Sequence, residues 1–165
     1  TGAAREEARR AAGSQPSAAG WLAVGRTAAA AGDLAEARDA YRRSLALSPL
    51  NPPVWAELGA LELRRGEEEA ALACYLTAAG ISHTSLGPAR AAGSLLLSRR
   101  GPEAALAFWG SLARRQPDWG YPPYARAEIF LRENDPERAE AELAEALRRD
   151  PENSLFLALQ GRIRR

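Results

Sequence analysis

The sequence contains no lysine. Its 22 basic residues are all arginine, and they nearly balance 21 acidic residues, which leaves a formal net charge of +1. A nucleic-acid-binding protein normally carries a basic excess or a basic stripe, so this composition argues against nucleic acid as a partner. The missing lysine and abundant alanine also fit the coding bias of a GC-rich genome and predict a bacterial source. That bias lowers the information carried by any single arginine.

Residues that usually build catalytic or metal sites are scarce. The chain has one cysteine, which excludes an internal disulfide, and one histidine, which excludes a two-histidine metal site. Cys74 and His83 are too far apart for a nucleophilic dyad, since their separation along the chain corresponds to more than about 10 Å. The glycines stand singly, so no glycine-rich phosphate-binding loop is present. The acidic run at 67–69 suits the first turn of a helix, where acids offset the helix dipole, better than a cation site. We therefore expect no enzyme activity, no metal and no cofactor.

Long apolar runs are also missing, because Arg, Glu or Gly interrupts each apolar stretch within a few residues. No segment that inserts into a membrane is therefore predicted. With 46% apolar and 26% charged residues the chain has the composition of a folded protein. It starts at Thr1 without a signal-like segment, which fits an excised or processed fragment. The compartment stays open: the cytoplasm is favoured, and the bacterial periplasm is the alternative if the N-terminus is truncated.

What the sequence does contain is a repeat of 34 residues. A fixed period of this length is typical of stacked-repeat proteins, in which each unit buries its apolar face against its neighbours. The repeated positions hold aromatic, glycine or alanine residues: Trp21 and Trp55; Gly25, Gly59 and Gly93; Ala37, Ala71, Ala105 and Ala139; and Tyr41, Tyr75 and Trp109.

Each period reads as two amphipathic helices joined by a short turn. At Gly32 and Asp33, for example, glycine suits a left-handed helix exit and aspartate suits the next N-cap. Gly101 lies 35 residues after Gly66 instead of 34, so the third turn should differ in shape. The predicted organisation is a truncated or frayed helix at 1–17 and a repeat domain at 18–164, with units at 18–51, 52–85, 86–119 and 120–153 and a capping helix at 153–164.

This pattern resembles the tetratricopeptide repeat family, whose motif runs W-x2-L-G-x2-Y, then A-x3-F, then P. Trp55-x2-Leu58-Gly59 matches the opening, and Ala37-x3-Tyr41 keeps an aromatic residue at the Phe position. The resemblance covers about residues 18–164 and implies an all-α fold, a right-handed superhelical solenoid of antiparallel helix pairs. The motif residues are expected to be structural, since small residues let helices approach and aromatic residues fill the space between units. The departures from the motif are Ala28, Glu62 and His83.

In this family the first helix of each unit lines a concave groove where ligands usually lie, so the resemblance puts the binding site there. A clamp for the acidic C-terminus of a chaperone is not reproduced in either register. We expect a protein or peptide segment with acidic and apolar residues, because Arg binds carboxylates and Tyr offers contact area at low entropy cost. The alternative is that these arginines are ordinary solvated residues. The expected groove residues are Arg26, Glu57, Arg64, Arg90, Ser94, Tyr121, Tyr124, Glu128 and Arg132.

The leading functional interpretation is an interaction scaffold or adaptor that binds a polypeptide segment. One rival is self-association, in which the open ends of the solenoid stack between copies and form a homo-oligomer. The other rival is a regulatory or substrate-docking arm of a larger enzyme whose catalytic part lies outside this chain.

Overall fold

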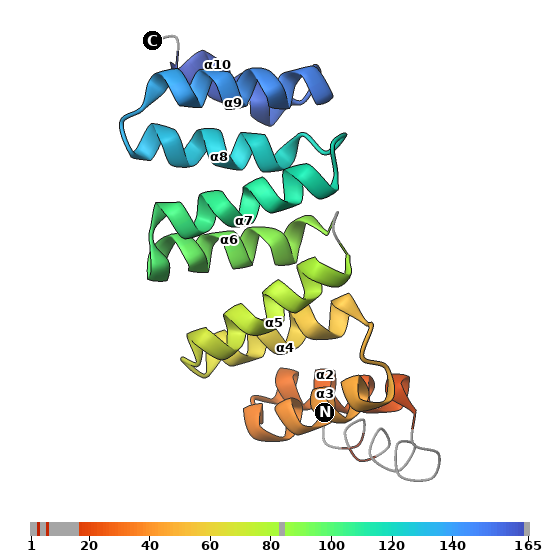
Figure 1. Cartoon of the computed structure of the whole chain (residues 1–165). Helices are drawn as coiled ribbons and strands as arrows, with labels where there is room; N and C mark the ends of the chain where they lie inside the picture. Colours follow the sequence, from red (N-terminus) through yellow and green to blue (C-terminus); the bar gives the residue numbers. More distant parts are fainter. Residues whose placement is uncertain (1–2, 4–5, 7–16, 83–84, 164–165) are drawn as a thin grey trace. The chain divides into compact units, whose positions relative to one another are not determined.

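The computed structural model describes residues 3, 6, 17–82 and 85–163. Within those residues every regular element is an α-helix, and no strand occurs, which confirms the predicted all-α fold. The helix predicted over 1–17 falls almost wholly outside the described residues, as does His83. The helices, labelled in Figure 1, are α2 (Ala18–Ala31), α3 (Leu34–Leu47), α4 (Pro52–Arg64), α5 (Glu68–Ile81), α6 (Leu86–Arg100), α7 (Pro102–Arg115), α8 (Tyr121–Arg132), α9 (Pro136–Arg149) and α10 (Ser154–Ile163).

The chain divides into two compact units, Thr1–Ala92 and Gly93–Arg165, with the boundary inside α6. In the first unit α2 packs on α3, α3 on α4, and α4 on α5. In the second unit α7 packs on α8, α8 on α9, and α9 on α10. Figure 1 shows α4 beside α5 and α8 beside α9, each pair joined by a short turn. Both units are therefore built from helical hairpins.

The turns inside the hairpins use residues that tolerate a left-handed backbone. Gly32, Gly66 and Gly101 have φ values of 84°, 79° and 85°, and Asn134 takes the same role in the α8–α9 turn with φ 58°. Glycine adopts this region without a Cβ clash, and asparagine is among the few other residues that do. The predicted difference in the third turn is confirmed, because Gly101 alone separates α6 from α7 and is itself the N-cap.

Side-chain caps then start the next helix. The Asp33 carboxylate accepts a hydrogen bond from the backbone N–H of Glu36 at 3.0 Å, and Asp135 accepts one from Arg138 at 3.0 Å. Each bond satisfies one N–H that has no partner within the helix. The glycine or asparagine exit and the aspartate cap together explain why the chain reverses where it does.

Close approach of the paired helices depends on a small residue facing a large one. A Cβ added to Gly25 would lie 2.6 Å from the Tyr41 ring. The same construction places a Cβ of Gly59 at 3.0 Å from Tyr75, and a Cβ of Gly93 at 2.6 Å from Trp109. Contacts under about 3.0 Å are closer than carbon atoms tolerate. A glycine in the first helix therefore receives the aromatic ring of the second.

Candidate functional site

The first unit carries a polar face formed by α2 and α4. Arg26 comes from α2, and Glu57 and Arg64 come from α4. A hollow of about 180 Å³ lies beside Glu57 and Arg64. Its lining combines small, charged and aromatic side chains: Ala29, Tyr41, Glu57, Ala60, Leu61 and Arg64. We call this region, together with Arg26, the α2–α4 face.

Arg26 and Glu57 form a two-pronged ion pair between the two helices. The Arg26 Nε donates to the two carboxylate oxygens at 3.1 and 3.0 Å, and Nη2 donates to Oε1 at 2.5 Å. The hydrogen bond and the charge of Glu57 raise the pKa of Arg26. Because the Arg26 side chain is 57% exposed, the pair stabilises the fold by only about 0.2–1 kcal/mol. Its main effect is to hold both groups in place.

Tyr41 links this surface pair to the core. The Tyr41 ring is buried against Gly25, and its hydroxyl donates to the Glu57 carboxylate. Burial, followed by the charge and hydrogen bond of Glu57, raises the pKa of Tyr41 to about 12. A repeat residue expected to be structural is therefore also part of the α2–α4 face. The sequence singled out Tyr41 as a repeat residue and Glu57 as a groove residue, but it did not indicate that the two side chains meet.

Arg64 closes the other end of the hollow. Its Nη1 donates to the backbone carbonyl of Ala29 at 3.3 Å, and the residue is exposed. A guanidinium has five N–H donors in a planar fork, so one contact to a carbonyl orients the group and leaves it suited to a carboxylate. The α2–α4 face thus presents a positioned cation beside a small apolar hollow.

The remaining expected groove residues lie elsewhere. Arg90 is exposed on the part of α6 that belongs to the first unit, and Ser94 is exposed on the part that belongs to the second. On α8, Glu128 is half-buried and Arg132 is exposed near the C-terminal end of the helix. The structure brings together Arg26, Glu57 and Arg64 in one unit, and Tyr121, Tyr124 and Glu128 in the other.

Tyr124 requires a correction. It was expected to line an exposed face, yet it is 4% exposed and stacks on Phe156 with ring centroids 5.0 Å apart. Burial, followed by a hydrogen bond to Glu128, raises the pKa of Tyr124. Tyr121 is half-buried and its ring lies 5.3 Å from that of Tyr124. Tyr124 is therefore a core residue of the second unit, because α10 supplies a ring that covers it.

Two further polar or reactive groups are buried in the first unit. Glu62, which departs from the repeat motif, is 2% exposed and accepts a hydrogen bond from Arg65 at 2.5 Å. Cys74 is buried, as predicted, and burial raises the pKa of its thiol to about 11. The thiol is therefore protonated at neutral pH, and a thiol is a poor nucleophile compared with a thiolate.

The described part of the chain has neither a cluster of metal ligands nor a membrane-spanning helix. In 17–82 and 85–163 no three His, Cys, Asp or Glu residues are grouped so as to hold a metal ion. No described helix is both long enough and apolar enough to cross a membrane.

Comparison with known proteins identifies the repeats. Residues 18–61 and residues 124–153 each match a family model described as tetratricopeptide repeat. No curated protein matches the sequence.

Solved structures with the same fold include three proteins of low sequence identity. YrrB, described as a TPR protein with an unusual peptide-binding site, is 17% identical, with a TM-score of 0.60 over 87% of this chain and 74% of YrrB. MamA is 13% identical, with a TM-score of 0.66 over 91% of this chain and 88% of MamA. PilF of Pseudomonas aeruginosa is 19% identical, with a TM-score of 0.64 over 94% of this chain and 72% of PilF.

At these identities the structural matches concern the fold alone. Together with the two family matches they support a general role in protein–protein interaction, and the fold is typical of non-enzymatic scaffolds. The hairpins, the glycine–aromatic contacts and the matched segments agree, and residues 18–61 and 124–153 are tetratricopeptide repeats within an all-helical repeat fold.

Proposed function

We propose that this protein is an interaction scaffold that binds an acidic polypeptide segment on the α2–α4 face of its first unit. The observation that carries the proposal is the positioned Arg64 guanidinium beside the hollow lined by Ala29, Ala60 and Leu61. A carboxylate of the ligand pairs with Arg64, and a small apolar side chain next to it enters the hollow. YrrB is described as having a peptide-binding site, which makes peptides the first ligands to test.

The Arg26–Glu57 pair sets the chemistry of the rest of this face. Arg26 is already bonded to Glu57 through two nitrogens, so a ligand carboxylate must compete for it. Glu57 also repels a second acid placed close to it. The proposed segment therefore carries one acidic residue at Arg64 and small apolar or polar residues toward Arg26, instead of a continuous acidic run.

Selection from a library of random decapeptides, with the purified chain as the target, tests this proposal. The selected peptides should share an acidic residue flanked by small apolar residues. Binding affinity, measured by fluorescence anisotropy, should fall about tenfold or more in Arg64→Glu, because reversal of the charge replaces attraction by repulsion at close range.

Arg115→Glu is the matched control, since Arg115 is an exposed arginine near the end of α7 in the second unit and the charge change is the same. Selected peptides that bind Arg64→Glu and Arg115→Glu equally well would remove the α2–α4 face from consideration. Peptides without an acidic residue would contradict the proposed ligand chemistry even if Arg64→Glu weakens them.

A further inference from the structure

The first unit holds a second hollow, of about 410 Å³, among α3, α4 and α5. It shares no lining residue with the hollow of the α2–α4 face. Pockets for small organic ligands have volumes of roughly 300–1,000 Å³, so this hollow has the size of a ligand site. We call it the α3–α5 hollow and define it by six of its lining residues: Arg42, Trp55, Leu58, Glu62, Ala70 and Cys74.

The α3–α5 hollow lies where the α8–α9 hairpin carries larger side chains. Glu62 stands two periods before Phe130, and Ala70 stands two periods before Arg138. Phe130 is buried, and the Arg138 guanidinium lies over its ring, 4.6 Å from the ring centroid. Ala70 is exposed and has no side chain that could reach across. The first unit therefore lacks both the ring and its cover in this row.

The walls of the hollow suit a flat apolar group. Leu45 and Leu58 are buried and form part of the lining, and Ala73 contributes a small apolar side chain. Trp55 is half-buried, and its indole N–H donates to the Pro49 carbonyl at 2.8 Å, which fixes the position of its ring. Aromatic rings pack well against one another at an offset or edge to face. The lining is thus complementary to an aromatic ring.

The charges beside these walls suit an anion. Glu62 is 2% exposed and accepts a hydrogen bond from Arg65 at 2.5 Å, while the Arg42 Nη2 lies 3.9 Å from Glu62 Oε1. Two guanidinium groups and one carboxylate leave a charge of +1. The distance from Arg42 to Glu62 is too long for a hydrogen bond, and a guanidinium has five N–H donors. Arg42, which is exposed, can therefore bind the carboxylate of a ligand.

We propose that the α3–α5 hollow binds a small aromatic carboxylate. The ring of the ligand packs against Trp55 and Leu58, in the row that Phe130 fills in the α8–α9 hairpin, and its carboxylate pairs with Arg42. One ring and one carboxylate use both the apolar walls and the excess positive charge, so the site needs no longer chain. This ligand goes beyond the peptide proposed for the α2–α4 face, because the two sites have no residue in common.

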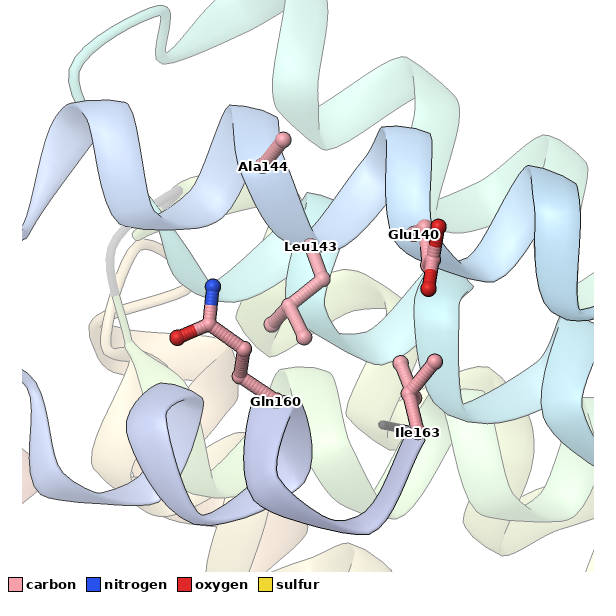
Figure 2. Close-up of a pocket in the computed structure, with 5 residues that line it drawn as sticks. All are labelled: Glu140, Leu143, Ala144, Gln160 and Ile163. Atoms are coloured by element: carbon pink, nitrogen blue, oxygen red, sulfur yellow. The ribbon is translucent and has the colours of Figure 1, made fainter. Parts of the chain in front are cut away.

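A pocket in the second unit shows the opposite chemistry. It has a volume of about 240 Å³ and lies between α9 and α10. Figure 2 shows Gln160 and Ile163 pointing from α10 toward α9, with Glu140 on α9 beside them. The described residues that line it include this carboxylate and no cation. An aromatic carboxylate should therefore avoid this pocket, because Glu140 repels it.

Titration of the full chain with 4-(trifluoromethyl)phenylacetate, followed by the fluorine NMR signal of the ligand, tests the proposal. Binding should saturate at one site. Ala70→Phe should abolish it, because the new ring occupies the hollow. Arg42→Gln should weaken it about fivefold, and the neutral amide of the same ligand should bind the original chain about fivefold more weakly.

Cys74 gives a second measurement that does not depend on the ligand signal. It is the only cysteine of the chain, it is buried, and it lines the α3–α5 hollow. Its alkylation by N-ethylmaleimide, followed by mass spectrometry, therefore reports on this one place. A saturating concentration of the acid should slow the alkylation about fivefold or more, since the bound ring covers the thiol.

Ala23→Phe and Arg115→Gln are the matched controls. Ala23 is an exposed alanine of α2, a helix that contributes no residue to the lining, and Arg115 is an exposed arginine of α7 in the second unit. Both changes should leave the affinity for the acid unchanged, as should Arg64→Glu on the α2–α4 face. Because Ala70 is exposed, Ala70→Phe should keep the circular-dichroism spectrum and melting temperature of the original chain.

Four results would overturn the proposal. The first is the absence of saturable binding by the acid, and the second is equal binding by Ala70→Phe and the original chain. The third is equal binding of the acid and its amide, because the carboxylate would then have no role. The fourth is protection of Cys74 by peptides selected on the chain but not by the acid, because the occupant would then be a polypeptide segment. Loss of binding in Arg64→Glu alone would instead place the acid on the α2–α4 face and equally contradict this site.

Discussion

The α8–α9 hairpin of the second unit closes with different side chains from the hairpins of the first unit. In the first unit Gly25 and Gly59 receive the rings of Tyr41 and Tyr75. In the α8–α9 hairpin of the second unit the same rows hold Ala127 and Leu143, which are 0% and 2% exposed. A larger residue on one helix is thus matched by a smaller one on the other, and the close packing of the hairpin is kept.

In the α8–α9 hairpin the aromatic volume lies outside this row. Tyr124 stacks on Phe156 at 5.0 Å, and Tyr121 lies 5.3 Å from Tyr124. In the first unit, by contrast, the ring of Tyr41 lies in the row itself, against Gly25. The comparison teaches that the repeat requires complementary volume along the hairpin, while the residues that supply this volume can differ from one hairpin to the next.

The largest effect is expected at Phe156. Phe156→Ala removes a 2% exposed ring from the core of the second unit, which should cost about 3–5 kcal/mol through lost burial and a cavity. Urea unfolding followed by circular dichroism measures the loss. Leu157→Ala, on the exposed neighbour, should change stability by less than about 0.5 kcal/mol. A similar small change for both would show that the ring stack does not hold this unit together.

An intermediate effect tests the matching of small and large residues. Gly25→Ala should cost about 1–3 kcal/mol because its Cβ would lie 2.6 Å from the Tyr41 ring. In a Tyr41→Leu background, which copies the Ala127–Leu143 pair, the same change should cost nothing. The double-mutant cycle measured by urea unfolding gives the coupling. Gly80→Ala should be neutral or stabilising, and an equal cost of Gly25→Ala in both backgrounds would break the comparison.

The smallest effect concerns the polar network above Tyr41. A tyrosine pKa raised to about 12 contributes stability that is fully present below pH 10 and is lost as the pH rises toward 12. Glu57→Gln removes the neighbouring negative charge, so the pKa of Tyr41 should fall and this alkaline loss should shrink. Ultraviolet titration of tyrosinate, with Tyr41→Phe to identify the signal, measures the change. Identical titration curves for the original chain and Glu57→Gln would remove Glu57 as a cause.

The helical hairpins were predictable from local sequence signals. The 34-residue period, the glycine or asparagine turns and the aspartate caps depend on backbone sterics and on neighbours within a few residues. The groove was less predictable. Positions spaced by 34 residues share one face of their helices, but the spacing does not tell which other residues cover that face. Tyr124 shows the difference: its row suggested exposure, and a ring from α10 buries it.

Sequence alone therefore determined the family, the helix pairing and the small–large rows, since each follows from periodicity and from the few residues that tolerate a left-handed turn. Tertiary structure decided which charged residues meet, as with Arg26 and Glu57, which are 31 residues apart in sequence. It also decided that the α3–α5 hollow stays open beside Glu62, while the Phe130 ring in the same row is covered by Arg138. Such outcomes depend on packing between distant segments, where burial and pairing are set by all the neighbours at once.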